Sequence, residues 1–112
     1  MFVAVYWWRA HPGKEEQFRR AWRRGTEHIA RIHGGLGSRL HRNADGRFVA
    51  YAQWPDEATW QRAFDAKMAY DDPETRAAFV DAIAEAPSDG MPVFTMTMTD
   101  DLLQSVPETT GD

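Results

Sequence analysis

Apolar residues change their spacing several times along the chain, and each change predicts a different element. Residues 2–10, FVAVYWWRA, are rich in β-branched and aromatic side chains, which is typical of a strand. The turn formers His11, Pro12 and Gly13 end this strand. In the following stretch, as far as about residue 33, apolar residues recur at spacings of three, four and seven, which predicts an amphipathic helix. Its expected buried face consists of Phe18, Ala21, Trp22, Gly25, Ile29 and Ile32.

The rest of the chain predicts a hairpin, an interrupted helix and a last strand. The sequence GGLG ends the first helix, and SRLHRN and RFVAYAQW then predict two strands joined by a turn at ADG. Asp56 starts a helix that runs through Trp60 and Phe64, and DDPE restarts it with Asp72 as the N-cap. The expected buried stripe of the restarted part consists of Ala77, Val80, Ile83 and Ala84. Alternation of Thr with Phe or Met in VFTMTMT predicts the last strand.

The predicted order is strand, helix, strand, strand, helix, strand. This βαββαβ order is typical of a ferredoxin-like α+β fold, in which the helices cover one face of a four-stranded antiparallel sheet. We expect one such domain at residues 1–103 and a flexible C-terminal tail at residues 104–112.

Both faces of the strand at residues 2–10 are apolar, so the face without helices also requires a cover. One row consists of Phe2, Ala4, Tyr6 and Trp8, and the other consists of Val3, Val5 and Trp7. Alternation alone leaves open which row lies under the helices. Because an apolar sheet face of this size marks an association surface, we expect a homodimer whose two sheets pack face to face.

Composition and charge exclude several classes of protein. The chain has 112 residues and no cysteine, which excludes disulfides, thiolate zinc sites, iron–sulfur clusters and a cysteine nucleophile. Basic residues concentrate in FRRAWRRG without a motif that reads nucleic acid, so we expect a solvated helix face and no nucleic-acid partner. The apolar N-terminus is too short for a membrane span and lacks the features of a signal peptide, which favours a soluble cytoplasmic protein. His28 and His33 do not share a helix face, and we expect no metal site.

Four stretches together carry a family resemblance. A strand followed by PGKEEQF in a helix, the glycine break, the strand in DGRFVAYAQW and the Trp-containing helix in DEATWQRAF resemble the antibiotic biosynthesis monooxygenase family. The resemblance spans about residues 2–103 and implies a dimeric α/β barrel. Members of this superfamily include quinone-forming monooxygenases, haem-degrading enzymes and proteins with no assigned activity.

The resemblance implies a cofactor-independent monooxygenase, whose aromatic or polyketide-like phenolic substrate itself supplies electrons to O2. Such a protein supplies a dry aromatic pocket, a group that helps to form the substrate anion, and donors that stabilise the oxyanion. Trp60 stands at the position of the family's pocket tryptophan, and with Tyr6, Tyr70 and His41 it forms the expected catalytic group. The expected substrate-binding residues are Trp8, Arg9, Arg39, Tyr51, Gln53, Phe64 and Met68.

Two other functions stay open. Haem-degrading relatives use an Asn, the helix Trp and a His ten residues after it, and here Tyr6 and Tyr70 stand at the positions of the Asn and the His. Tyrosine ligates haem iron only as a phenolate beside a cation, so the expected cofactor is none and haem is disfavoured. The other alternative is a non-catalytic dimer that binds a small aromatic ligand or stabilises a partner enzyme, in which Trp60 serves packing alone.

Overall fold

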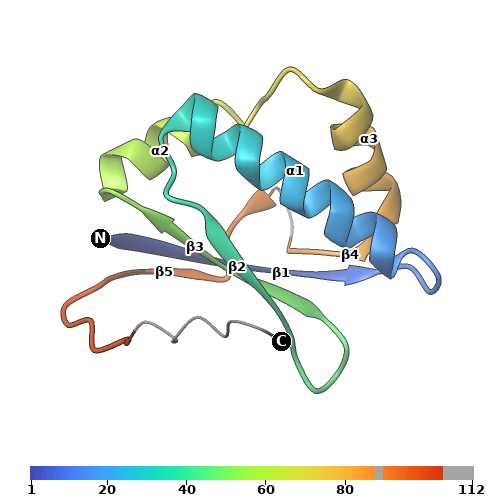
Figure 1. Ribbon diagram of the computed structural model, residues 1–112, viewed down its shortest axis with the longest axis horizontal. Helices are drawn as coiled ribbons and strands as arrows, with labels where there is room; N and C mark the ends of the chain where they lie inside the picture. The colour runs from blue at the N-terminus through green and yellow to red at the C-terminus, as the bar shows by residue number, and fades with distance from the viewer. Residues whose placement is uncertain (88–89, 105–112) are drawn as a thin grey trace, which may run out of the picture.

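One antiparallel sheet and three helices form the part of the chain that the computed structural model describes, residues 1–87 and 90–104 (Figure 1). The strands are β1 (Phe2–Ala10), β2 (Ser38–Arg42), β3 (Phe48–Trp54), β4 (Ile83–Glu85) and β5 (Phe94–Thr97). The helices are α1 (Glu15–His33), α2 (Glu57–Asp65) and α3 (Pro73–Ala82). The expected α+β, ferredoxin-like fold is confirmed, and the short strand β4 is an addition to the predicted order.

Strand β1 is the centre of the sheet. It pairs with β3 from Phe2 to Trp8, and β3 in turn pairs with β2. Along its other edge β1 pairs first with β5 and then, near Ala10, with β4. Residues that lie on β1 therefore contact both halves of the sheet.

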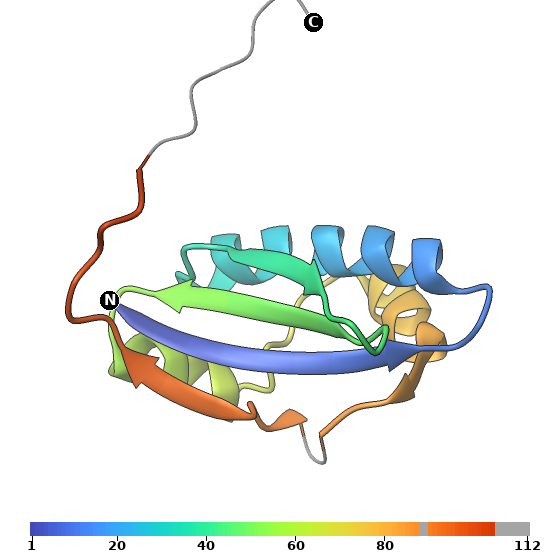
Figure 2. The same cartoon turned by 90° about the horizontal axis from the view of Figure 1, so that it is seen from below.

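The three helices lie on the same side of the sheet, and the opposite side carries no helix (Figure 2). Helix α1 ends at Gly34, which adopts a left-handed conformation with φ of 80°. Asp56 and Asp72 cap α2 and α3, because each carboxylate accepts a hydrogen bond from the backbone N–H three residues later. None of the helices in the described residues combines the length and apolar composition that crossing a membrane requires.

The even-numbered row of β1 faces the helices. Phe2 and Ala4 are buried there with Trp54, Trp60 and Ala63. At the other end of the same row, Trp8 packs against a second cluster that contains Phe18 and Phe48. This assigns the row that alternation left open.

The odd-numbered row lies on the face without helices. Trp7 and its neighbours on β3, Val49 and Tyr51, are partly exposed on this face. Phe94 and Met96 of β5 lie beside the same row and are 54% and 40% exposed. The described chain therefore presents an apolar sheet face to solvent.

Two details of the expected packing are wrong. Ile32, in the last turn of α1, is 42% exposed. On α3, Val80 is 60% exposed and Ala77 is also exposed, whereas Thr75 and Ala82 are buried and Phe79 packs into the core. The Phe79 ring decides this orientation because it stacks on Phe18 at 5.3 Å. Ile83 and Ala84 belong to β4, so they do not extend the helix stripe.

Of the expected tail, residues 105–112 lie outside the described part of the chain.

Candidate functional site

A partly open cavity of about 240 Å³ lies between α1, the even-numbered face of the sheet and the connection from α2 to α3. Its walls are mostly apolar and aromatic. The main side chains that line it are Tyr6, Trp8, Trp22, Trp54, Met68 and Tyr70. The structure thus brings together Tyr6, Trp8, Gln53, Met68 and Tyr70 of the residues expected from the sequence.

Small residues create the space for the cavity. Tyr6 pairs with Ala50 of β3, and Ala4, the next residue of β1 on the same face, pairs with Ala52. The Tyr6 ring therefore has only methyl groups beside it on β3. On α1, Gly25 lies against Tyr70, and a Cβ at this position would be 2.9 Å from Tyr70 Oη. The absence of a side chain at Gly25 therefore lets the Tyr70 ring rest on the helix.

Tyr6 is held by Trp60. The Trp60 Nε1–H donates a hydrogen bond of 3.1 Å to Tyr6 Oη, while the Trp60 ring is buried between Phe2 and Phe64. Trp60 and Phe64 do not line the cavity and therefore lie behind its wall, where Trp60 positions Tyr6. Burial raises the pKa of Tyr6 above its ordinary value, although the hydrogen bond from Trp60 opposes this. The hydroxyl of Tyr6 consequently stays protonated at neutral pH and can donate a hydrogen bond.

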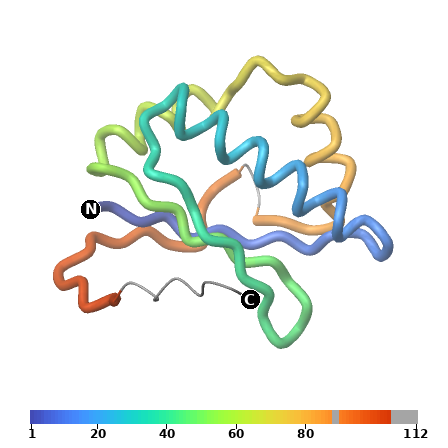
Figure 3. Tube along the Cα trace, in the orientation of Figure 1, coloured from blue at the N-terminus to red at the C-terminus, as the bar shows by residue number. Residues whose placement is uncertain are grey.

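The connection between α2 and α3 runs past α1 (Figure 3). Its residues Lys67, Met68 and Tyr70 line one side of the cavity. Arg76 stabilises it, because its guanidinium lies 4.5 Å above the Tyr70 ring and also donates a hydrogen bond of 2.8 Å to the Met68 carbonyl. Lys67 and Met68 both have left-handed backbone, with φ of 58° and 50°. This conformation ends α2 and turns the chain towards α1.

Helix α1 also holds this connection through Tyr70 and Asp72. The His28 ring stacks on Tyr70 at 5.1 Å, and its Nε2 lies 3.0 Å from the Asp72 carboxylate. Burial raises the pKa of Tyr70, with Arg76 opposing the shift. Hydrogen bonds from the side chain and backbone of Thr75, followed by that from His28, lower the pKa of Asp72 to about 2. The Asp72 carboxylate thus both caps α3 and anchors the connection to α1.

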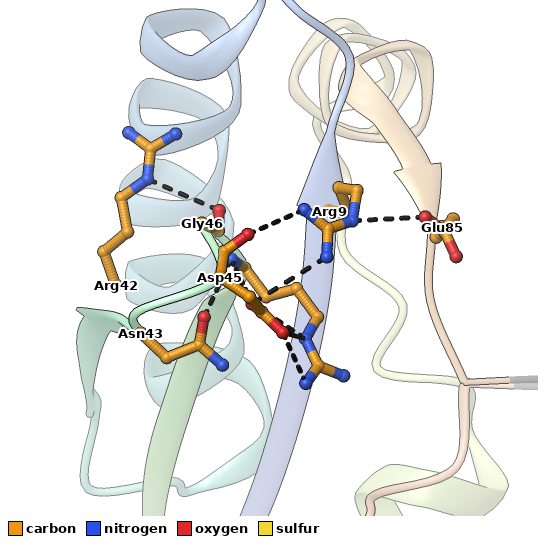
Figure 4. A network of polar contacts seen from close by, with 7 residues as sticks. Arg9, Arg42, Asn43, Asp45, Gly46 and Glu85 are labelled. Atoms are coloured by element: carbon orange, nitrogen blue, oxygen red, sulfur yellow. Dashed lines mark hydrogen bonds and ion pairs between the residues drawn. The ribbon is translucent and has the colours of Figure 1, made fainter.

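Several residues expected at the site lie away from the cavity. Arg9 forms ion pairs with Asp45 and Glu85 at the far end of β1, as Figure 4 shows. On β2, Arg39 and His41 lie on the opposite face from Ser38 and Leu40, and they pair with Tyr51 and Val49 of β3. Arg39 and His41 therefore face the side of the sheet without helices, as does Tyr51. His41 Nδ1 lies 3.3 Å from the carbonyl of Val49. Arg9, Arg39 and His41, which the sequence analysis expected at the site, are therefore not cavity residues.

The cavity also contains residues that the sequence did not identify as site residues. Trp22 and Gly25 follow the helix period and were assigned to the core, and Trp54 shares a strand face with Phe48. Ser38 and Trp54 have a further property, because Ser38 Oγ and Trp54 Nε1 are buried and have no hydrogen-bond partner among residues 1–87 and 90–104. Two buried polar atoms without a partner are a feature that only the packed structure reveals.

The lining has few groups for acid–base or metal chemistry. Its described residues include Lys67 and Arg76 but no Asp, Glu or His. In the same part of the chain, no cluster of three His, Asp or Glu side chains is placed to hold a metal ion. The arrangement can therefore bind a flat apolar ring and donate hydrogen bonds to its oxygen atoms.

Comparison with solved structures supports the fold assignment. A monooxygenase from the gene ActVA-Orf6 of Streptomyces coelicolor, in complex with the ligand Nanaomycin D, is 28% identical with a TM-score of 0.58, and the match covers 93% of this chain and 92% of that chain. SnoaB, a cofactor-independent oxygenase from Streptomyces nogalater, shares the fold at 20% identity and a TM-score of 0.62, covering 92% and 97% of the two chains. Rv0793 from Mycobacterium tuberculosis also shares the fold, at 11% identity and a TM-score of 0.61, and the match covers 91% of this chain and 98% of that chain.

Comparison by sequence gives the family. No curated protein matches the chain. The family model described as antibiotic biosynthesis monooxygenase matches residues 1–69, which is more than half of the chain and includes β1, α1, the hairpin and α2. The family match confirms the resemblance carried by the motifs, and the chain belongs to the antibiotic biosynthesis monooxygenase family.

Proposed function

We propose that this protein is a monooxygenase that oxidises a flat phenolic substrate with O2 in the cavity, without a bound cofactor. The observation that carries the proposal is the Tyr6 hydroxyl, which Trp60 holds at the wall of an aromatic cavity. Membership of the family and the 28% identity to a monooxygenase with a bound ligand support the same reading.

The proposed reaction converts a ring CH2 group and O2 into a ring carbonyl and water. The substrate loses a proton and its anion transfers an electron pair to O2, which forms a C–O bond. The second hydrogen of this carbon then leaves as a proton while the O–O bond breaks, so that the carbonyl forms and the outer oxygen leaves as water. Because the described lining lacks Asp, Glu and His, the proton passes to water at the cavity opening. The protein contributes a dry environment and the Tyr6 O–H, which donates to the developing oxyanion.

Oxygen uptake by metal-free protein with a panel of anthrones and hydroquinones tests the proposal. We expect Tyr6→Phe to lower the rate by about 100-fold, since it removes one donor to the oxyanion. Trp60→Phe removes the hydrogen bond to Tyr6 and should have a smaller effect in the same direction. Tyr51→Phe is the matched control, because it removes a tyrosine hydroxyl on the opposite face of the sheet. No turnover by the wild type, or equal rates in all three variants, would contradict the proposal.

Binding without catalysis is the second candidate. The same lack of a carboxylate or imidazole in the described lining favours it, since no side chain there is suited to remove a substrate proton. Native mass spectrometry that shows retained aromatic ligand, together with no oxygen consumption, would identify a ligand-binding protein.

Haem does not fit the residues present. A tyrosine ligand to haem iron acts as a phenolate, but burial raises the pKa values of both Tyr6 and Tyr70. In addition, the Tyr6 oxygen already accepts a hydrogen bond from Trp60, and the Tyr70 hydroxyl rests against Gly25. Neither oxygen is placed to act as an iron ligand, and titration with haemin should give no Soret shift.

We also propose that the protein acts as a homodimer through the sheet face without helices. Trp7, Tyr51, Phe94 and Met96 give this face an aromatic and apolar surface in the described chain. Leu102 and Leu103 follow β5 and are 90% and 70% exposed, which suits contact with a second copy. A second sheet packed on this face would remove all of these side chains from water.

A further inference from the structure

Helix α1 directs its arginines to two different sides. Arg24 and Arg31 reach towards the connection between α2 and α3, where they form ion pairs of 3.4 Å and 3.9 Å with the two aspartates that precede α3. Arg19 and Arg23 instead line a second, open cleft of about 460 Å³, which lies between α1 and β2. We call it the arginine cleft.

The β2 wall of the arginine cleft carries a third arginine. Arg42 lies on the helix side of the sheet and pairs with Phe48 of β3. Its guanidinium lies 4.7 Å from the centre of the Phe48 ring, and its Nε–H donates a hydrogen bond of 3.4 Å to the Gly46 carbonyl (Figure 4). Among the described residues, the hydrogen bonds of Arg42 do not involve its two terminal nitrogens. The side chain is therefore held in place while its outer N–H groups are available to a ligand.

The protein supplies little negative charge to balance these three arginines. Arg19 pairs with Glu16 at 3.2 Å, and both side chains are exposed. Arg23 and Arg42 form no ion pair within residues 1–87 and 90–104. Because like charges on facing walls repel each other, the cleft is more stable when an anion lies between them.

The floor of the arginine cleft is apolar. It is formed by Trp22, Leu40 and Phe48, which pack in one cluster and of which Phe48 is only 4% exposed. Trp22 also lines the cavity on its other side, whereas none of the three arginines does. The cleft is therefore a separate site beside the cavity, with an apolar floor and a cationic rim.

We propose that the arginine cleft binds a small molecule that carries a phosphate monoester on an aromatic or other apolar body. The forked guanidinium donates to two phosphate oxygens at once, and a cleft lined by one sign of charge concentrates the opposite ion. The whole chain carries a net charge of -4, so a long polyanion that reached beyond the cleft would meet repulsion. The site does not depend on the proposed function, because none of its arginines takes part in the proposed reaction.

Calorimetric titration of the full chain with naphthyl phosphate, naphthol and inorganic phosphate tests the proposal. We expect naphthyl phosphate to bind most tightly and its affinity to fall as salt is added. Arg23→Gln should weaken naphthyl phosphate binding about 3- to 5-fold, as expected for an exposed ion pair, and leave naphthol binding unchanged. Arg20→Gln is the matched control, since Arg20 is another exposed arginine of α1 that does not line the cleft.

Two further variants separate charge from geometry. The double variant Arg19→Gln/Arg23→Gln should lose more affinity for naphthyl phosphate than Arg23→Gln alone. Arg42→Lys keeps the charge but lacks the planar fork that lies over Phe48, so it should lose part of the affinity. Naphthyl phosphate should also shift the Nε–H resonances of Arg23 and Arg42 in NMR spectra, and naphthol should not. The Tm of ligand-free Arg23→Gln should equal that of the wild type, which separates loss of binding from loss of folding.

Four results would overturn the inference. The first two are an unchanged affinity for naphthyl phosphate in the double variant and an equal loss in Arg20→Gln. The third is inorganic phosphate that binds as tightly as naphthyl phosphate, since the apolar floor would then contribute nothing. The fourth is tighter binding to a short DNA duplex or to vesicles that contain phosphatidic acid, which would make the arginines part of a surface for polyanions or membranes.

Discussion

Gly25 contacts Tyr70 closely enough for a double-mutant cycle to measure how the cavity wall fits α1. A Cβ added at Gly25 would lie 2.9 Å from Tyr70 Oη but 3.4 Å and 3.5 Å from the ring atoms Cζ and Cε1. Only the first distance is shorter than ordinary van der Waals contact. Gly25→Ala must therefore move the Tyr70 hydroxyl in the wild type, whereas in Tyr70→Phe the same methyl group meets only normal contacts.

The expected energies follow from this geometry. Alanine in place of glycine inside a helix stabilises a protein by about 1 kcal/mol, and we expect this full gain in the Tyr70→Phe background. In the wild type, the displaced ring loses part of its stack on His28 and of its contact with Arg76. Such aromatic and cation–π contacts contribute about 0.5–1.5 kcal/mol each, so the gain should be cancelled. The coupling free energy between the two positions is therefore expected to be about 1 kcal/mol.

Urea unfolding of the wild type, both single variants and the double variant measures this coupling. The free energies are comparable only if all four proteins show two-state transitions with the same dependence on urea. A stabilisation by Gly25→Ala that is the same in both backgrounds would refute the close contact. The Tyr70 hydroxyl would then lie elsewhere, and the cavity would have a different wall.

Two further predictions concern the cap of α3 and the open sheet face. Asp72→Ala should lower Tm at pH 7 more than Asp71→Ala, which changes an exposed neighbour. Because folding lowers the pKa of Asp72 to about 2, the contribution of this carboxylate to folding stability is complete above the ordinary carboxyl pKa near 4. The difference in Tm should then shrink as the pH falls from about 4 towards 2, and a constant difference would contradict this. Phe94→Lys should convert the dimer to a monomer in light scattering. Val80→Lys, at an equally exposed position on the helix side, should leave it dimeric, and a wild-type monomer would remove the proposal.

The elements of the fold could be predicted because their signals are local. The caps Asp56 and Asp72 each precede a threonine by three residues, and the α1 period identifies Phe18 and Ala21 correctly. The α3 stripe could not be predicted in the same way. Its weakly amphipathic sequence permits more than one orientation, and Phe79 selects one only through contact with Phe18 from another helix.

The candidate site was less predictable because cavities depend on residues that are small or distant in sequence. The aromatic residues Tyr6, Trp8 and Tyr70 could be selected by type and by family position. Gly25 contributes by having no side chain, and this matters only once Tyr70 lies against it. In the same way, a serine in a short edge strand carries no sequence signal until its hydroxyl is seen to be buried.

The pairing register explains why one row of β1 forms a cavity and the other an open face. Both rows are apolar, so hydrophobic alternation permits either arrangement. In the observed register, however, Tyr6 lies beside Ala50, which leaves room above the sheet for a ligand. On the other face Trp7 lies beside Val49, and Arg47 covers its ring at 4.8 Å. A shift of one residue would turn Tyr6 away from Trp60 and from the cavity, so the register of β1 with β3 specifies both the proposed catalytic donor and the surface proposed for the second subunit.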